Sequence, residues 1–373
     1  MPAQDKGLFE ATKLAPLVSA DRLRLARELR GWTQRSLADE MESSGNAVTP
    51  AALSQLELGR TTPTGKTLLA IAGATGLPLD YFIRHDADSN IDGFFRSLRS
   101  APARERRWAV ARAHLLHDAV RVVEHYVELP DLQVPRISLP VRDRASIEEA
   151  ASIVRTLWGL GSFPVPNVLR ELEGHGIPTT RLALDRKKLD AFSVWFPDRP
   201  IVVLVADKDS TARSRFDAAH ELGHGVLHGP SDVGTKEAEQ EAHWFAAAFL
   251  MPEESISNVL APSVKWRELM DVKAEWGVSL AALLLRARNL KILSDARYVS
   301  AVKYMSARGW RKAEPGDRLL GPPEEPRLIQ AAVRQLQKTG LDIEDLAGEA
   351  GLPAGDLREL LTLGGNARQR IEP

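Results

Sequence analysis

The sequence predicts a multidomain, mainly α-helical fold with a small β-sheet in its second half. The chain has 373 residues, enough for two or three domains that each bury a core. Most segments carry apolar residues at helical spacing behind a capping residue, and short apolar runs typical of strands cluster between residues 177 and 205. We therefore expect four parts: a five-helix domain (18–90), a helical connector with a proline-rich linker (91–140), an α+β domain with the small sheet (141–310) and a helical C-terminal module with a disordered end (311–373).

The composition is that of an ordinary globular protein, with 44% hydrophobic and 27% charged residues and a net charge of −1. Such a charge gives no global sign of nucleic-acid binding, so any basic surface is local. The absence of cysteine excludes thiolate metal ligands and cysteine catalysis, and leaves imidazole and carboxylate groups. Residues 1–20 lack a signal-peptide core, and no segment reaches the ~20 apolar residues of a membrane span. We expect a cytoplasmic protein without membrane contact.

The first domain is predicted to be a packet of short helices. Gly31 ends the first helix, Thr33 caps the second, and Thr49 with Pro50 opens the third. The predicted helices are 20–30, 34–41, 51–58, 65–75 and a fifth that begins at Leu77.

Two segments of this domain, Leu25–Ala38 and Ala52–Arg60, resemble the Cro/lambda-repressor (XRE) helix-turn-helix family. The resemblance implies binding to double-stranded DNA, with the helix at 50–58 in the major groove and Gln34 facing a phosphate. Two departures reduce base readout: extra residues at 42–48 in the turn, and a recognition helix that starts with proline and two alanines. The candidate DNA contacts are Gln34, Thr49, Ala51, Ser54, Gln55 and Arg60. The alternative is a domain for protein contact or dimerisation.

The connector is predicted to contain one long, arginine-rich helix over residues 103–127, followed by a linker with three prolines at 129–140. One interpretation is a solvated linker helix. The other is a stalk that joins two copies in a homodimer and adds phosphate contacts.

The α+β domain is predicted to begin with helices 146–158 and 164–173. A strand follows at 177–183, and the runs 191–196 and 200–205 form a hairpin.

Its most informative pattern is His-Glu-x-x-His, at His220, Glu221 and His224. On a helix the two histidines lie one turn apart, about 6 Å along the axis, and point from one face at a single metal ion. Glu221 is rotated by about 100° and can reach a metal-bound water as a general base. The neighbouring residues are apolar or small, and imidazoles on a buried helix need a partner, which a metal supplies. The alternative is an amphipathic helix with two surface histidines.

The next predicted helix, 237–251, can supply the third protein ligand of a catalytic zinc. Glu239 shares a stripe with the small residues Ala242 and Ala246, which allow close approach to the histidine helix. Glu239 is therefore the expected ligand, and Glu241, about 200° away, is the reserve.

Two further histidines are expected to support the site rather than to bind the metal. His228 continues the four-residue spacing, but three turns of one helix span about 12 Å, too far for three rings to meet one ion. His243, one turn after Glu239, is expected to support a ligand or to face the substrate.

These two helices, from Arg213 to His228 and from Glu239 to Pro252, resemble the ImmA/IrrE family of zinc metallopeptidases, and a weaker resemblance covers roughly residues 143–260. It implies a thermolysin-like (gluzincin) site in which His220, His224 and Glu239 bind zinc and Glu221 is catalytic. This chain has His243 where the family usually has asparagine. In a zinc peptidase an edge strand of a small sheet commonly pairs with the substrate backbone, and the sequence leaves open which strand that is.

The remainder of the chain is predicted to be helical, with helices at 265–276 and 279–290 and a last module at 325–364. Residues 341–360 have the spacing of a helix-turn-helix motif but are acidic, so we expect a protein contact there rather than a second DNA-binding motif. Residues 365–373 are predicted to be disordered.

Two functions fit these observations. The first is a DNA-binding regulator with a zinc-dependent endopeptidase, because the ImmA/IrrE resemblance implies cleavage of a helix-turn-helix repressor, or of the chain itself, in response to stress or a signal. The second is a transcription factor whose peptidase-like domain is not catalytic and senses a metal or a ligand.

Overall fold

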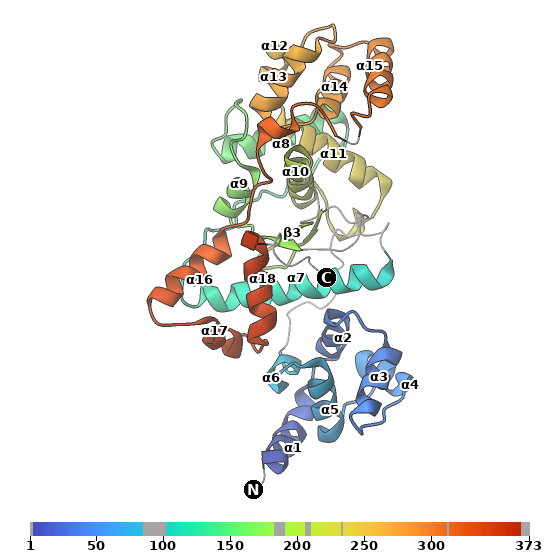
Figure 1. The fold of residues 1–373 in the computed structure, drawn as a ribbon, viewed down its shortest axis with the longest axis vertical. Coiled ribbons are helices and arrows are strands. Elements are labelled where there is room, and N and C mark those ends of the chain that lie inside the picture. Colours follow the sequence, from blue (N-terminus) through green and yellow to red (C-terminus); the bar gives the residue numbers. More distant parts are fainter. Residues whose placement is uncertain are drawn as a thin grey trace.

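The computed structural model describes residues 3–84, 102–182, 191–205, 210–232, 234–311 and 313–366. It is mainly helical with one small sheet, as predicted (Figure 1). The N-terminal helices lie at one end of the molecule, α7 runs across its middle, the sheet and helices α8 to α15 lie on the far side of α7, and the C-terminal helices pack against α7 itself. Among the described residues, no helix is both long and apolar enough to span a membrane.

The N-terminal domain confirms the predicted packet of short helices. Thr33 and Thr49 cap two of the helices as expected, and Ser19 and Thr64 cap two more; each side chain accepts a hydrogen bond from the backbone amide three residues later. The helices are α2 (Ala20–Leu29), α3 (Gln34–Ser43), α4 (Pro50–Glu57), α5 (Gly65–Thr75) and the short α6 (Leu79–Phe82).

A further helix, α1 (Ala3–Leu14), precedes this packet and was not predicted. It packs on α5 at Gly65, where a Cβ atom would lie only 2.6 Å from the Cα of Thr12. Only a residue without a side chain permits this approach. The helix has no strong apolar stripe of its own, which explains why the sequence pattern did not reveal it.

The long helix α7 (Ala103–Glu124) confirms the predicted element and corrects its interpretation as a solvated linker helix. Every residue from Ala111 to Val120 is buried within the chain, including Arg112, so this stretch offers no apolar face to a second copy. The homodimer and the phosphate contacts stay predictions. On one side Asp118 accepts a hydrogen bond from Arg22 of α2 at 2.8 Å, and on another Arg112 pairs with Glu359 at 2.8 Å. The proposed boundary at residue 90 lies outside the described residues.

The predicted sheet has three strands in the order β1–β3–β2, comprising β1 (Thr179–Leu182), β2 (Ala191–Val194) and β3 (Ile201–Val205). The predicted hairpin is confirmed, since β2 pairs antiparallel with β3 and Val194 lies opposite Ile201. β1 pairs parallel with β3. Alternate residues of β3 belong to two separate cores, Val202 and Leu204 facing one and Val203 the other. A strand buried on both faces has no polar side, which explains its uninterrupted apolar sequence.

One of these cores fills the part of the chain that carries the histidine motif, where helices pack on one face of the sheet. The histidine helix α10 lies on β2 and β3, and α11 packs between α10 and α8. The helices of this part are α8 (Arg144–Leu157), α9 (Val168–Gly174), α10 (Thr211–Leu227), α11 (Lys236–Leu250), α12 (Glu253–Val259), α13 (Trp266–Trp276), α14 (Leu280–Asn289) and α15 (Asp295–Ala307).

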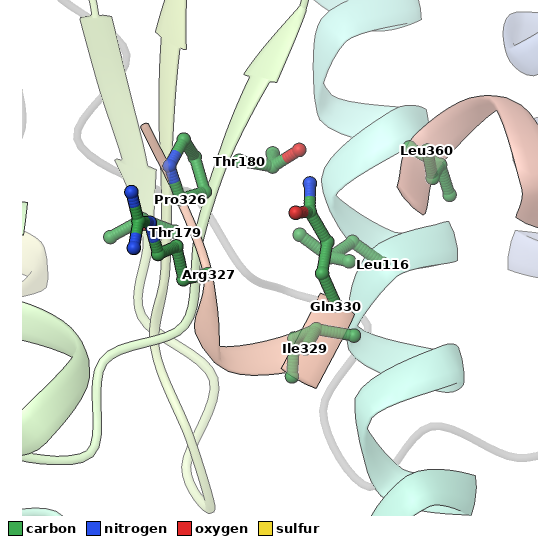
Figure 2. A pocket seen from close by; sticks show the side chains of 8 residues that line it. All are labelled: Leu116, Thr179, Thr180, Pro326, Arg327, Ile329, Gln330 and Leu360. Carbon is green, nitrogen blue, oxygen red and sulfur yellow. The ribbon is translucent and has the colours of Figure 1, made fainter. Parts of the chain in front are cut away.

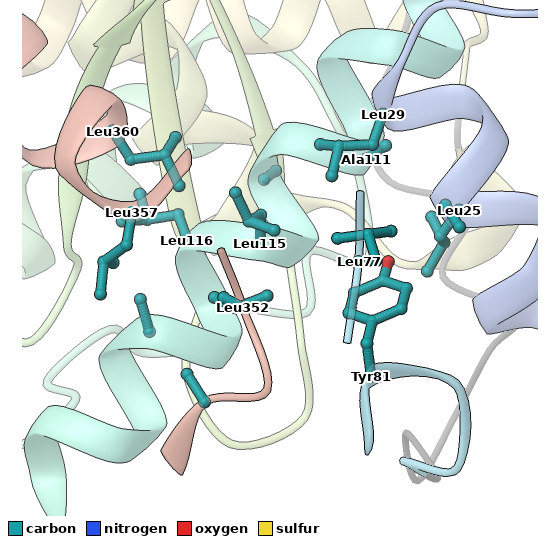
Figure 3. Close-up of a cluster of buried hydrophobic side chains, with 14 of the residues drawn as sticks. Leu25, Leu29, Leu77, Tyr81, Ala111, Leu115, Leu116, Leu352, Leu357 and Leu360 are labelled. Carbon is teal, nitrogen blue, oxygen red and sulfur yellow. The ribbon is translucent and has the colours of Figure 1, made fainter. Parts of the chain in front are cut away.

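The other core joins the N-terminal domain, α7, the opposite face of the sheet and the C-terminal module (Figure 3). That module consists of α16 (Leu328–Lys338), α17 (Ile343–Glu349) and α18 (Ala354–Asn366). Its acidic residues make contacts within the chain: Asp356 pairs with Arg30 at 2.8 Å, and Glu349 accepts from His125 at 2.7 Å. The expected protein contact is therefore at least in part an intramolecular one, and most of the predicted disordered end lies outside the described residues.

A small cavity lies where α7, β1 and the start of α16 meet (Figure 2). None of its lining residues belongs to the histidine and glutamate motif; they are Leu116, Thr179, Thr180, Pro326, Arg327, Ile329, Gln330 and Leu360.

Candidate metal centre

Helix α10 carries the His-Glu-x-x-His motif in a fully buried stretch. Ser210 caps its start, and every residue from Ala218 to His228 is buried. Two glycines bring neighbouring rings onto the helix backbone: a Cβ atom on Gly225 would lie 1.7 Å from Cζ2 of Trp195, and one on Gly223 would lie 3.0 Å from Cδ1 of Phe245. The motif is thus enclosed by the sheet on one side and by α11 on the other.

Three side chains of α10 and α11 converge at one point. The Nε2 atoms of His220 and His224 lie 3.0 Å apart. Glu239 of α11 places one carboxylate oxygen 3.5 Å from the first nitrogen and the other oxygen 3.5 Å from the second. Within the described part of the chain, these residues form the one group of three that has metal-ligand spacing.

This donor set fits a metal. In a tetrahedral zinc site with bonds of 2.0–2.1 Å, neighbouring ligand atoms are about 3.3–3.4 Å apart, close to the separations seen here. The chemistry also fits, because two imidazoles and a carboxylate with one position left over is a common arrangement of catalytic zinc. His220 Nε2, His224 Nε2 and a Glu239 oxygen are therefore the atoms that would hold the ion.

The protonation states suit metal binding. Burial lowers the pKa of His220, and it lowers that of His224 to about 3, so both rings are neutral and each carries one nitrogen lone pair. Burial by itself would raise the pKa of Glu239, but the two histidine rings beside its carboxylate hold that pKa well below the usual range. The set therefore presents two neutral nitrogens and one carboxylate.

Glu221 has a structural partner that the sequence did not reveal. Ser193 of β2 donates a hydrogen bond to Oε2 of Glu221 at 2.6 Å, and Trp195 Nε1 donates to the Ser193 hydroxyl at 3.1 Å. Burial raises the pKa of Glu221 to about 8, and the Ser193 hydrogen bond opposes this rise. A carboxyl group with a pKa near neutrality can both take up and release a proton at physiological pH.

Glu241, the reserve ligand, lies apart from the histidine pair. Its Oε2 atom is 3.0 Å from Nε2 of His228, whose Nδ1 atom is 2.9 Å from Nδ1 of His224. Burial lowers the pKa of His228, and the Glu241 carboxylate opposes this change. His228, bonded in turn to Glu241, thus contacts the candidate ligand His224 from behind, on the ring edge that faces away from Glu239.

His243 is exposed and lies beside the site without joining the three converging groups. Its ring centroid is 4.6 Å from that of His220, in an edge-to-face arrangement, and its Nδ1 atom is 2.7 Å from the backbone oxygen of Glu239. It therefore packs against one candidate ligand and bonds the backbone of another.

Four residues of this environment were missed by sequence reasoning because they come from other segments of the chain: Ser193, Trp195, Arg142 and Asp232. The pairing of β2 with β3 sets the first two against α10, and Arg142 joins Asp232 to Glu241 at 2.8 and 3.4 Å. No local spacing links these positions to the motif.

In the N-terminal domain, the predicted DNA contacts cluster at α3 and α4. Thr49, Ala51 and Arg60 are exposed, and Ser54 and Gln55 are partly exposed. Gln34, by contrast, donates its side-chain amide to Glu57 at 2.9 Å, and Glu57 also binds Arg27 at 2.6 Å. The phosphate contact of Gln34 stays a prediction, because its side-chain amide donates to Glu57 within the domain.

Comparison with known families finds one match for the N-terminal domain and another for the part of the chain that carries the candidate metal centre. Residues 23–82 match the helix-turn-helix family, and residues 172–288 match the IrrE N-terminal-like domain of a peptidase family that is generally metal-dependent. The chain joins both domains. A search of curated proteins finds no match to it. The peptidase-family match includes α10 and α11, and the helix-turn-helix match covers α2 to α6, so the first domain is a DNA-binding one.

Proposed function

We propose that this protein is a DNA-binding transcriptional regulator with a zinc-dependent endopeptidase, which cleaves a helix-turn-helix repressor or the chain itself in response to stress or a signal. The convergence of His220, His224 and Glu239, next to the buried Glu221, is the observation that carries the proposal. The repressor substrate rests on the ImmA/IrrE resemblance of the motif.

The residues around the site have separate roles in the proposed reaction. A bound zinc ion would supply Lewis-acid polarisation of water and of a peptide carbonyl. Glu221 takes the proton of the attacking water and delivers it to the leaving amine. Ser193, held by Trp195, orients the Glu221 carboxylate through its hydrogen bond at 2.6 Å. The enclosing sheet and α11 exclude bulk water, which strengthens these interactions.

The test compares the full-length protein with its Glu221→Gln variant. We expect both proteins to contain zinc, because Glu221 is not a ligand, and cleavage of repressors encoded near this gene to fall by about 10²–10⁴-fold in the variant. Glu237→Gln removes an exposed carboxylate from α11 and serves as the matched control. Loss of zinc from the Glu221→Gln protein would contradict the assigned role.

A second candidate function is a sensor without catalysis, and His243 favours it, because an imidazole packs against His220 where the family usually has asparagine. In that case the zinc-loaded wild-type protein cleaves neither a neighbouring repressor nor itself. Glu221→Gln would then leave transcriptional control unchanged, whereas the peptidase proposal requires that control to be lost.

A further inference from the structure

His228 and Glu241 form a buried pair directly behind the candidate ligand His224. His228 is the C-cap residue of α10, and its side chain is fully buried. One ring nitrogen, Nδ1, lies 2.9 Å from Nδ1 of His224, and the other, Nε2, lies 3.0 Å from Glu241 Oε2. The three groups are therefore arranged in a row that ends at His224 Nε2, the nitrogen that faces Glu239.

The chemistry of this row determines where its protons lie. A carboxylate oxygen only accepts, so His228 Nε2 carries the hydrogen and donates it to Glu241. A neutral imidazole has one N–H, so His228 Nδ1 is left as an acceptor. His224 Nδ1 must then donate to it, and the lone pair of His224 is placed on Nε2. That is the tautomer a metal ligand requires.

The pair is held in place by groups from three segments. Arg142 lies 3.4 Å from Glu241 Oε2 and 2.8 Å from Asp232. Asp232 in turn accepts a hydrogen bond from the Gly229 amide at 2.8 Å, directly after His228. The segment before α8, the turn after α10 and the first half of α11 thus fix the His228 ring relative to Glu241.

The other candidate histidine ligand lacks such support. His220 Nδ1 is buried and has no hydrogen-bond partner within the described residues. No group behind the His220 ring therefore fixes the state of its Nδ1 atom, whereas His228 fixes that of His224 Nδ1. This asymmetry makes His224 the pre-oriented ligand of the two.

We propose that Glu241 and His228 are positioning residues: through a carboxylate–histidine–histidine relay they hold His224 in the Nδ1–H tautomer and direct its Nε2 lone pair at a divalent cation. The inference rests on the proposed metal site but not on catalysis, because it concerns how one ligand is prepared before the ion binds. Such supporting groups typically contribute about 10- to 100-fold to metal affinity.

The direct test is the tautomer of each ring in metal-free full-length protein with ¹⁵N-labelled histidine, measured above the usual histidine pKa of about 6.5. The nine histidines are assigned by single substitution. We expect His224 as the Nδ1–H form and His228 as the Nε2–H form. His224 found as the Nε2–H form would overturn the proposal, because its lone pair would then lie on Nδ1 and face His228.

Zinc affinity, measured by competition with a chromophoric chelator, is the second readout. His228→Leu removes the acceptor and should weaken zinc binding by about 10- to 100-fold, whereas His228→Gln, whose amide oxygen can accept from His224, should restore part of the affinity. Glu241→Gln should weaken binding in the same direction, and Glu237→Gln, on the exposed side of α11, should not.

The outcomes separate this proposal from the proposed function. Unchanged zinc affinity in folded His228→Leu and Glu241→Gln proteins would refute the relay while leaving the peptidase intact. If His228→Leu does not fold, Glu241→Gln and the wild-type tautomers decide the question. If wild-type protein shows the expected tautomers and binds zinc through them but cleaves no substrate, the proposed function fails and the relay stands.

Discussion

Replacement of Gly225 by alanine should strain the wall of the candidate site. The added Cβ would lie 1.7 Å from Cζ2 and 1.8 Å from Cη2 of Trp195, whereas carbon atoms in contact are normally about 3.5–4.0 Å apart. The ring would have to move by about 2 Å. It is held there by its hydrogen bond to Ser193 at 3.1 Å and by Arg136, which lies 5.1 Å from the ring centroid.

We expect Gly225→Ala to destabilise the folded protein by about 1–3 kcal/mol, the usual cost of overpacking. The better helix propensity of alanine, at most about 1 kcal/mol, offsets part of this cost. Urea unfolding followed by circular dichroism measures the change. Gly174→Ala in α9 is the matched control, because no atom lies within 4 Å of its added Cβ and the variant should be neutral or slightly stabilised.

A double-mutant cycle identifies the cause. In a Trp195→Ala background the ring is gone, so Gly225→Ala should lose its penalty and show only the propensity gain. If the penalty persists without the ring, or if Gly225→Ala matches Gly174→Ala in the wild-type background, Trp195 does not pack on Gly225 as described.

Three further outcomes are expected. Asp118→Ala removes the carboxylate that pairs with the buried Arg22 guanidinium and should cost about 3–5 kcal/mol in denaturant unfolding. Replacing both residues by apolar ones should recover much of that loss, and equal stability of the single and double variants would contradict this. Burial lowers the pKa of His114 to about 4, so between pH 6.5 and 4 the unfolded chain binds a proton that the folded protein does not. The free energy of unfolding should therefore decrease as the pH is lowered through this range, by up to about 1.4 kcal/mol per pH unit. His114→Gln should flatten this slope, and an unchanged slope would exclude His114 as its source. Arg60→Ala should weaken duplex binding and reduce its salt slope by about 1, measured by fluorescence anisotropy, and a slope equal to wild type would mean that Arg60 contacts no phosphate.

The sequence by itself determined what depends on local geometry. The four-residue spacing of His220 and His224 places both rings on one face of a helix in any fold, because the helix repeat is the same everywhere. Capping residues such as Thr33 and Thr49 likewise located helix starts to within one residue, since a cap bonds an amide only two or three positions away. The stripe on α11 favoured Glu239 over Glu241, and the structure brings Glu239 to the histidine pair.

Only the tertiary structure decided which distant groups meet. Ser193 reaches Glu221 because β2 pairs with β3 beside α10, and nothing in either local sequence encodes that pairing. Glu241 appeared to be an alternative metal ligand, yet it faces His228, because the packing of α11 on α10 and the position of Arg142 set its partner.

The helix α7 shows the same limit most clearly. Its arginines suggested a solvated surface, because a charged side chain is normally exposed unless it is paired. Arg112 is buried nonetheless, and its partner Glu359 lies 247 positions further along the chain. The periodicity of α7 follows from its own residues, but whether its charges face water depends on elements that reach it only when the whole chain has folded.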